Sequence, residues 1–343
     1  MPQVDRAPEG SLPPSSPPLL RSTPVDALDP HLRQLTAEIA PGSTATDLGG
    51  WMSRNLLLEP AGIVLRVHPP YVTRRRLLAV QHVRQTLAGT GIRVPVALSR
   101  DGVTAFRCGD RWAETERHVP HETPPSTWQS YAWMFRAMGT LHRRLAAVDL
   151  RGPRPSTAIF AAPNTLWAWL PTTEAAVAGD AESTQIARSL RSLLGRLRYR
   201  WMSPTGLPHQ LVHGDVKLEN LGIGPSGETV FLDFGFVTHR PRIHDLAFSL
   251  THSVLTVDGH VPTDPTMFPW HRVRRLVEEY EESTGAPLTV LERRALAPYT
   301  AAARIYHATY AGFGPNPAEW LHNNVPAIQF SDWLLEHPEV LSG

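Results

Sequence analysis

The stretch LVHGDVKLENLGIGPSGETVFLDFG, residues 211–235, places a polar loop and a hairpin behind an apolar strand end. A first strand is predicted at Leu221–Ile223, and the turn residues Pro225–Gly227 follow it. Residues 229–233 predict the returning strand, which ends at an aspartate shortly before a glycine. The stretch therefore predicts a hairpin that presents polar side chains at one end.

Three oxygen-bearing side chains are spaced along this hairpin. Asp215 follows the apolar strand end, Asn220 comes five residues later, and Asp233 ends the returning strand. Two carboxylates and an amide are hard donors that suit Mg²⁺, which leaves its other positions to water and substrate phosphates. Phosphoryl transfer needs a group near the attacking hydroxyl, metal ions on the phosphates and cations that hold the transferring group. The stretch can supply each of these parts.

Lys217 is the single lysine in a chain that has 33 basic residues. Either chance left it on a loop surface, or the site needs a compact ammonium group. An ammonium is a point charge that can follow a phosphoryl group from donor to acceptor, whereas a guanidinium is a rigid planar fork. The residues alone leave both interpretations open.

The composition is that of a globular protein without an extreme charge. The chain has 343 residues, 42% of them hydrophobic, which suffices for one large domain or for two lobes around a cleft. A formal net charge of +1 gives no reason to expect nucleic acid or an anionic membrane as partner. The single cysteine, Cys108, excludes an intramolecular disulfide and suits a reducing compartment. No apolar run reaches the roughly 18 residues of a membrane span, so we expect a cytoplasmic protein.

The first part of the chain predicts a small sheet with one helix against it. Residues 1–25 are rich in proline and serine, so we expect a disordered tail. The elements expected after it are a helix at about 27–40, two strands over 47–67, a helix over 74–91 and short strands over 94–120.

The second part of the chain is mainly helical. Its amphipathic stretches predict helices within residues 126–148, 181–202, 271–285 and 289–312. The hairpin of residues 211–235 lies between these helix pairs, where a cleft would be.

HGDVKLEN, residues 213–220, and LDFG, residues 232–235, resemble the catalytic and metal loops of the aminoglycoside phosphotransferase family, small-molecule kinases of the protein-kinase-like fold. The resemblance implies an α+β, bilobal protein-kinase-like fold. Its small antiparallel β-sheet N-lobe, with the hinge, spans residues 26–119, and its mainly helical C-lobe spans residues 120–343.

The same resemblance assigns roles within the hairpin. It implies that Asp215 is the catalytic carboxylate facing the acceptor hydroxyl, and that Asn220 and Asp233 are the Mg²⁺ ligands. Lys217 would hold the γ-phosphate of the donor nucleotide, which is ATP or GTP. The binding partners implied are thus a nucleotide and a small-molecule acceptor.

The stretch LGGWMSRNLLLEPAGIVLRV, residues 48–67, is similar to the first hairpin of that family. By this resemblance Gly49, Gly50 and Ser53 lie near the nucleotide phosphates, and Arg66 takes the phosphate-holding position. Backbone without Cβ atoms can approach phosphates closely and offer N–H donors.

The helix over residues 74–91 departs from the kinase pattern. Kinases carry a glutamate on this helix that pairs with the phosphate-holding cation, but here the helix contains no acidic residue. Gln81 or His82 would offer a neutral hydrogen bond to Arg66, or Arg66 would meet the nucleotide directly.

The resemblance also names a hinge and two supporting residues. Backbone groups of Glu116, Arg117 and His118 would recognise the purine edge of the nucleotide. His213 would pack under the catalytic loop, and Asp245 would brace that loop by accepting backbone hydrogen bonds.

Gly214 follows His213 where many protein kinases carry an arginine that reads an activation-loop phosphate. Because this cation is missing, we expect an enzyme that needs no such activation.

The acceptor site is expected in the helical lobe. Glu279 within VEEYEEST, together with Trp270, Tyr310 and Trp320, are the candidates for contacting the acceptor. Acidic runs on helices are more often solvated faces, and aromatic residues at helical spacing more often form core. The near-neutral charge favours a neutral or weakly charged glycosylated or nucleoside antibiotic over a polycationic aminoglycoside.

Three functional hypotheses follow. The first is a nucleotide- and Mg²⁺-dependent kinase that phosphorylates a hydroxyl of an antibiotic. The second is a metabolic kinase of the same fold that acts on a sugar, choline-like or amino-alcohol acceptor. The third is a pseudokinase that binds nucleotide without transferring phosphate.

Overall fold

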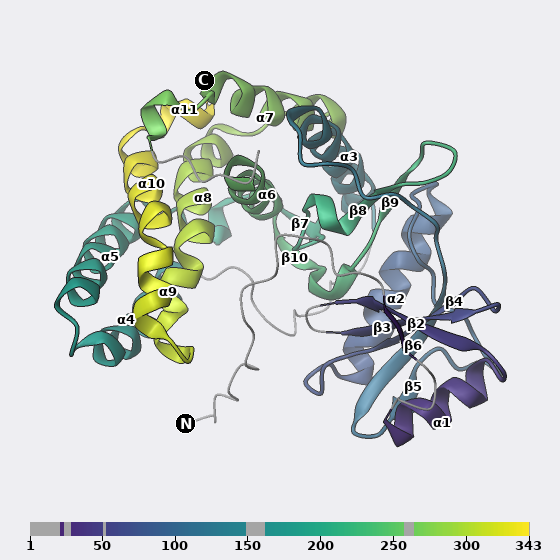
Figure 1. Ribbon diagram of the computed structural model, residues 1–343. Coiled ribbons are helices and arrows are strands. Elements are labelled where there is room, and N and C mark those ends of the chain that lie inside the picture. The colour runs from purple at the N-terminus through teal and green to yellow at the C-terminus, as the bar shows by residue number, and fades with distance from the viewer. Residues whose placement is uncertain (1–20, 24–28, 51–52, 149–161, 257–263, 343) are drawn as a thin grey trace.

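A computed structural model describes residues 21–23, 29–50, 53–148, 162–256 and 264–342 of the chain (Figure 1). Figure 1 shows a small lobe built around a sheet and a larger lobe built of helices. The short strand pairs β7–β10 and β8–β9 lie between them. The α+β, bilobal protein-kinase-like architecture expected from the sequence is confirmed.

The N-lobe is a six-stranded antiparallel sheet in the order β1-β2-β3-β4-β6-β5. Its strands are β1 (Arg21–Thr23), β2 (Thr44–Gly49), β3 (Arg54–Glu59), β4 (Ile63–Val67), β5 (Phe106–Cys108) and β6 (Arg111–Arg117). The helices of this lobe are α1 (Pro30–Ile39) and α2 (Arg74–Gly89).

One face of this sheet packs into an apolar core, and the other face carries charged side chains of the candidate site. On one face Leu56, Leu58 and Leu65 pack against Leu32 and Leu35 of α1. Because successive side chains of a strand point to opposite faces, the residues next to these leucines face α2 and the helical lobe. That second face carries the charged side chains described below.

The C-lobe is mainly helical. Its helices are α3 (Trp128–Ala146), α4 (Pro163–Val177), α5 (Ala181–Arg200), α6 (Ile243–Thr256), α7 (Trp270–Thr284), α8 (Val290–Tyr310), α9 (Pro317–Asn323), α10 (Val325–Glu336) and α11 (Glu339–Ser342). Strand β7 (His209–Val212) pairs with β10 (Thr238–Pro241), and β8 (Leu221–Ile223) forms a hairpin with β9 (Thr229–Phe231). Two short helical turns, η3 (Leu218–Asn220) and η4 (Phe234–Phe236), follow β7 and β9.

Local signals explain several helix starts. The Thr127 side chain accepts a hydrogen bond from the backbone of Ser130 and caps α3. Thr289 and Glu292 form a reciprocal capping box at the start of α8. One continuous apolar core then runs through α3, α5, α6, α7, α8 and α10.

Some elements differ from the sequence expectation. Residues 21–23, expected in the disordered tail, form β1, because they pair with β2 in the register Arg21↔Asp47 to Thr23↔Ala45. The rest of the tail prediction lies outside the described residues. The helix α6 was not predicted by periodicity, because residues 243–251 are all buried and so lack the polar face that reveals a helix. Among the described helices, none has the length and apolar character needed to cross a bilayer.

Two glycines inside helices should respond to alanine in opposite directions. A Cβ at Gly139 of α3 would lie 2.6 Å from the carbonyl oxygen of Tyr280 in α7, whereas one at Gly195 of α5 meets nothing within 4 Å. We expect Gly139→Ala to lower the free energy of unfolding by about 1–3 kcal/mol through overpacking. Gly195→Ala, the matched control, should raise it by about 0.4–1 kcal/mol. Urea denaturation followed by circular dichroism measures both, and equal shifts of the two variants would contradict the packing of α3 on α7.

Candidate active site

The catalytic loop, residues 213–220, connects β7 to β8 and takes its shape from a glycine. Gly214 has a φ of +87°, and a Cβ at this position would lie 2.6 Å from the carbonyl oxygen of Phe236 in η4. Both the backbone conformation and the close approach require glycine here. The absence of an arginine after His213 therefore has a structural reason, because the fold has no room for a side chain.

Asp245, in the first turn of α6, holds the start of this loop. Its carboxylate accepts hydrogen bonds from the backbone of His213 at 2.8 Å and of Gly214 at 2.9 Å, and from the His142 ring at 3.0 Å. Burial by itself raises the pKa of a carboxyl, but hydrogen bonds from His142 and His244 hold the pKa of Asp245 well below its usual range. Asp245 therefore stays ionised, and its carboxylate holds the loop by accepting hydrogen bonds from the backbone of the loop.

His213 lies beneath the loop and is fully buried. Its Nε2 lies 2.8 Å from the carbonyl oxygen of Leu232, and its Nδ1 accepts from the backbone of Asp215 at 3.3 Å. These two contacts require a neutral ring that donates at Nε2. Burial lowers the pKa of His213, which favours this form. The ring thus joins the loop to the strand that leads to Asp233.

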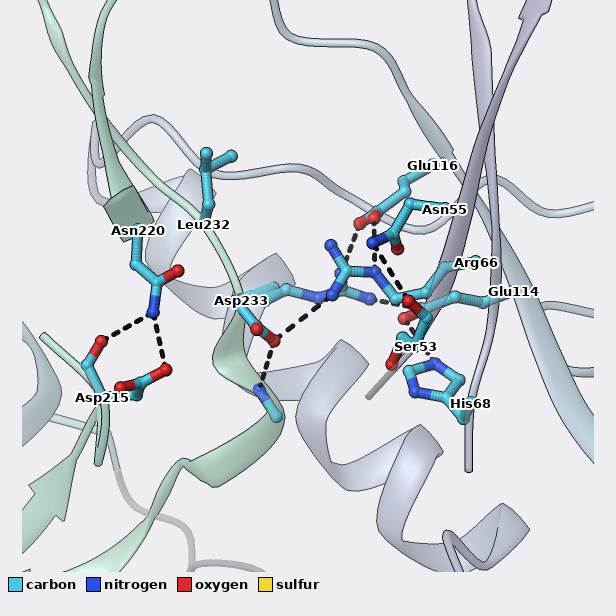
Figure 2. A network of polar contacts seen from close by, with 12 residues as sticks. Ser53, Asn55, Arg66, His68, Glu114, Glu116, Asp215, Asn220, Leu232 and Asp233 are labelled. Carbon is cyan, nitrogen blue, oxygen red and sulfur yellow. Dashed lines mark hydrogen bonds and ion pairs between the residues drawn. The ribbon is translucent and has the colours of Figure 1, made fainter. Parts of the chain in front are cut away.

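Asp215 is a carboxylate with one oxygen engaged and one without a partner (Figure 2). It is 4% exposed, and its Oδ2 accepts from the Asn220 amide at 2.7 Å and lies 3.4 Å from the Lys217 ammonium. Oδ1 is buried without a hydrogen-bond partner in the described structure. Burial raises the pKa of Asp215 to about 7, although the charge of Lys217 acts in the opposite direction. A carboxylate with this pKa and a free oxygen suits the acceptance of a proton near neutral pH.

Asp233 stands between the two lobes. Its backbone is left-handed, with a φ of +52°, so the chain turns sharply into η4. Its carboxylate remains 41% exposed and lies 3.3 Å from the Arg66 guanidinium of the N-lobe. Partial burial raises the pKa of Asp233, but the charge of Arg66 outweighs it, so the pKa lies below its ordinary value. Asp233 is thus an ionised carboxylate that is partly accessible.

Asn220 is held against Asp215 by its side-chain amide. Its amide nitrogen donates to the backbone oxygen of Asp215 at 2.8 Å and to Oδ2 at 2.7 Å, which leaves the side-chain oxygen for another ligand. Figure 2 shows Asp215 and Asn220 on one side of Asp233 and Arg66 on the other. Among the described residues no group of three or more His, Cys, Asp or Glu side chains forms a metal cluster. An amide and a carboxylate oxygen instead fit Mg²⁺, which takes its other ligands from water and phosphates.

Arg66 finds its acidic partner on a strand. Its Nε donates to Glu116 of β6 at 3.1 Å, and its Nη1 to Asp233 at 3.3 Å. Gln81, one of the neutral partners considered from the sequence, instead donates to Glu114 at 3.0 Å, and His82 is exposed. Neither neutral alternative is therefore correct.

The helix that lacks an acid supplies a buried cation. Arg84 of α2 forms ion pairs with both Glu114 and Glu116. Glu114 also accepts from His68 at 3.1 Å. Compared with the kinase pattern, the charges are reversed, because the acids lie on the strand and the cation on the helix. Burial lowers the pKa of Arg66, but Glu116 and its neighbours outweigh it, so the pKa of Arg66 is raised and its charge is retained.

A sequence signal for this network was present. Glu114 and Glu116 occupy alternate positions of the predicted strand, and so share one face of it. A shared face with two acids opposite a helix that contains arginine indicates an ion pair.

The sequence matches the model of the phosphotransferase enzyme family over residues 44–303. The chain belongs to this family. The resemblance to aminoglycoside phosphotransferases is thereby confirmed, and the protein is a small-molecule kinase. No curated protein sequence matches the chain.

Solved structures share the fold of this kinase at low sequence identity. A microcompartment-associated aminopropanol kinase has a TM-score of 0.65 and 17% identity, and the match covers 90% of this chain and 97% of that one. An amicoumacin kinase in complex with AMP-PNP and Ca²⁺ has a TM-score of 0.61 and 12% identity, with 85% and 88% covered. A choline kinase from Cryptosporidium parvum has a TM-score of 0.58 and 12% identity, with 90% and 96% covered.

The turn between β2 and β3 of the kinase contains the expected glycines. Gly49 and Gly50 have φ values of +76° and +133°, and Asn55 donates to the carbonyl oxygen of Gly49 at 2.7 Å. A Cβ at Gly50 would lie 2.5 Å from the carbonyl oxygen of Ser53. The glycines are therefore required by this tight turn, and Asn55, which the sequence did not single out, fixes it.

Two of the three expected hinge residues have contacts within the N-lobe sheet. Glu116 directs its side chain into the ion-pair network, and its backbone pairs with Val64 of β4. The backbone N–H of His118 donates to the carbonyl oxygen of Gly62 at 2.9 Å. The backbone of Glu116 and the N–H of His118 are thus engaged within the sheet, and the purine contacts expected of these two residues stay predictions. Arg117 ends β6 and is exposed, and its proposed role at the hinge stays a prediction.

Two of the four acceptor candidates have other partners. Glu279 forms ion pairs with Arg136 at 2.9 Å and Arg275 at 3.0 Å on the surface between α3 and α7. Trp270 is buried and stacks on Trp333, with 5.2 Å between ring centroids. Both side chains already have partners within the C-lobe, and their role in acceptor binding stays a prediction.

The other two acceptor candidates lie at the end of α8 and in α9. Tyr310 packs on Trp169 and on Phe313, with centroid separations of 5.7 Å and 5.0 Å. Trp320 donates through Nε1 to the carbonyl oxygen of His307 at 2.9 Å. Their role in acceptor binding stays a prediction.

The pH dependence of the kinase should follow Asp215. Because only the ionised carboxylate accepts a proton, we expect kcat/KM to fall about tenfold per pH unit below the pKa of Asp215, which is about 7. Lys217→Met removes the charge that lowers this pKa, so the acid limb should move to higher pH. Lys217→Arg keeps the charge and should leave the limb in place while turnover falls. An acid limb that is identical in wild type and Lys217→Met would contradict this role of the ammonium.

The buried network should be costly to break. Arg84→Met leaves Glu114 and Glu116 without their shared cation, and we expect the free energy of unfolding to fall by about 3–5 kcal/mol. The double variant Arg84→Met/Glu114→Gln removes one of the stranded charges and should recover part of the loss. Arg75→Met, an exposed position on the same helix, is the control. Additive losses in the double variant would argue against coupling between these side chains.

Proposed function

We propose that the chain transfers the γ-phosphate of ATP or GTP to a hydroxyl of a small molecule in a reaction that requires Mg²⁺. The observation that carries the proposal is that a buried Asp215 with a raised pKa lies near enough to the ionised, partly exposed Asp233 for the charge of Asp233 to act on it. Asn220 and Asp233 would hold Mg²⁺, which when bound neutralises charge on the donor phosphates. The complete set of catalytic-loop residues argues against the pseudokinase alternative.

Each side chain then has a defined task. The unpartnered Oδ1 of Asp215 receives the proton of the acceptor hydroxyl. Lys217 lies at the same carboxylate and is the cation closest to the position of the transferring group. Arg66, fixed by Glu116, offers its charge to the donor phosphates from the N-lobe. The expectation that no activating phosphate is needed agrees with the enclosed Gly214.

The acceptor we propose is neutral or weakly charged. The acidic run of α7 does not offer a wall for a polycation, because its carboxylates pair with arginines. Glu278 and Glu282 lie 3.1 Å and 3.3 Å from Arg275, and Glu281 lies 2.6 Å from Arg293. This arrangement supports a glycosylated or nucleoside antibiotic, with resistance as the consequence. An amino alcohol or choline-like metabolite is the second candidate, since two of the similar structures are an aminopropanol kinase and a choline kinase.

The decisive experiment is a transfer assay with a matched inactive variant. Wild type is incubated with Mg²⁺, with ATP and with GTP, against a panel of neutral antibiotics, aminoglycosides and amino alcohols, and mass spectrometry detects the added phosphoryl group. We expect Asp215→Asn, which keeps the shape of the side chain, to lower kcat by about 10²–10⁴-fold while the nucleotide Kd stays unchanged. Transfer at the wild-type rate by this variant, or nucleotide binding without transfer to any hydroxyl compound, would argue against the proposal.

A further inference from the structure

Arg76 is a buried arginine that the catalytic machinery does not use. It lies in the first turn of α2 and is 7% exposed. One of its terminal nitrogens, Nη2, donates to the carbonyl oxygen of Gly235 at 2.6 Å. The other two nitrogens, Nε and Nη1, are enclosed and have no hydrogen-bond partner within the described chain. A side chain with this many unused donors is expensive to bury.

A second arginine, Arg240, follows the same turn along the chain and lies near enough to Arg76 for its charge to act on it. Arg240 belongs to β10, which begins two residues after η4, and its Nη1 lies 2.9 Å from Nε2 of His244. Burial lowers the pKa of Arg240, and it lowers that of Arg76 to about 10, an effect that the positive charge of Arg240 reinforces. Two like charges are thus held near each other and partly out of water.

The acidic residues around this pair are engaged elsewhere. Asp233 pairs with Arg66. Asp245 attracts Arg240, but its two oxygens accept from the backbone of the catalytic loop and from His142. Within the part of the chain that the structure describes, neither Arg76 nor Arg240 forms an ion pair with a carboxylate. Cations in such surroundings are normally accompanied by an anion.

We propose that Arg76 and Arg240 bind an oxyanion, of the phosphate or carboxylate class, beside the turn at residues 233–235. The planar guanidinium fork offers adjacent N–H groups that match the geometry of such oxygens, and the unused Nε and Nη1 of Arg76 are donors of this kind. A bound anion would satisfy these donors and cancel the repulsion between the two arginines.

The position of the site gives it a role in the proposed reaction. Arg76 belongs to the N-lobe and Arg240 to the C-lobe, and the turn between them carries Asp233. An anion held by both arginines links the lobes at this turn and favours the geometry in which Asp233 meets Arg66. This consequence for the rate rests on the proposed function, whereas anion binding itself does not.

A binding experiment tests the site without relying on turnover. Inorganic phosphate is titrated by calorimetry into the full chain at constant ionic strength, with the nucleotide site filled by Mg²⁺ and a non-hydrolysable ATP analogue. We expect one saturable phosphate site in the wild type. Arg76→Gln and Arg240→Gln should each weaken it at least about tenfold, because each removes charge-assisted hydrogen bonds. Arg75→Gln, an exposed neighbour on the same helix, should leave the Kd unchanged.

The outcomes separate a ligand site from a contact between the lobes. If Arg76 serves only to hold Gly235, Arg76→Gln lowers stability and the wild type shows no saturable phosphate binding, which overturns the proposal. Phosphate binding that persists unchanged in both glutamine variants overturns it as well. Should Arg76→Gln fail to fold, Arg240→Gln and Arg76→Lys carry the test, and the lysine variant should bind phosphate more weakly than the wild type.

Kinetics distinguish the two sources of such an anion. If the oxyanion is a group of the acceptor itself, free phosphate competes with the acceptor and raises its KM. If the oxyanion is a separate effector, phosphate changes kcat at saturating acceptor, and this response disappears in Arg240→Gln. Failure of the transfer assay with intact phosphate binding would reject the proposed function and leave the anion site standing.

Discussion

The active site depends on one buried carboxylate that binds backbone instead of substrate. Asp245 accepts the N–H groups of His213 and Gly214, and this directs the following residues toward the cleft. The left-handed Gly214, pressed against Phe236, allows the tight path. His213 then ties the loop to Leu232, one residue before Asp233. Through these contacts the two halves of the hairpin keep Asp215 and Asp233 in one cleft, which is what phosphoryl transfer requires.

In the N-lobe, Arg66 is held by an ion-pair network whose charges are reversed relative to the kinase pattern. A helix that carries an acid can break its pair with the phosphate-holding cation when it moves away from the sheet. Here the acid for Arg66 is Glu116, on a neighbouring strand of the same sheet, and the helix is attached to that strand through Arg84. The position of Arg66 is thus set by the sheet, and α2 is joined to it by buried charges that are costly to separate.

The arginines of the structure differ in whether they form ion pairs with carboxylates. The arginines of α7 and α8 neutralise an acidic run that would otherwise attract a polycation. Arg76 and Arg240, by contrast, form no ion pair with a carboxylate of the described chain, although Asp245 attracts Arg240. This distribution supports the proposal that the acceptor is not strongly cationic. It also supports the proposal that an anion binds beside the turn that carries Asp233.

The sequence by itself predicted the hairpin and, through the motifs at residues 213–220 and 232–235, the family, because the residues that carry these signals are close in sequence. Amphipathic helices such as α3 and α8 were also predicted, from the periodic spacing of their apolar residues. The partners of the buried arginines were not, because Arg66 and Glu116 are 50 residues apart and Arg76 and Gly235 are 159 apart. Only the packing of α2 against the sheet and against η4 decided which charges meet. The tertiary structure also decided the partners of Glu279 and Trp270, since the neighbours of a side chain are not specified by local sequence.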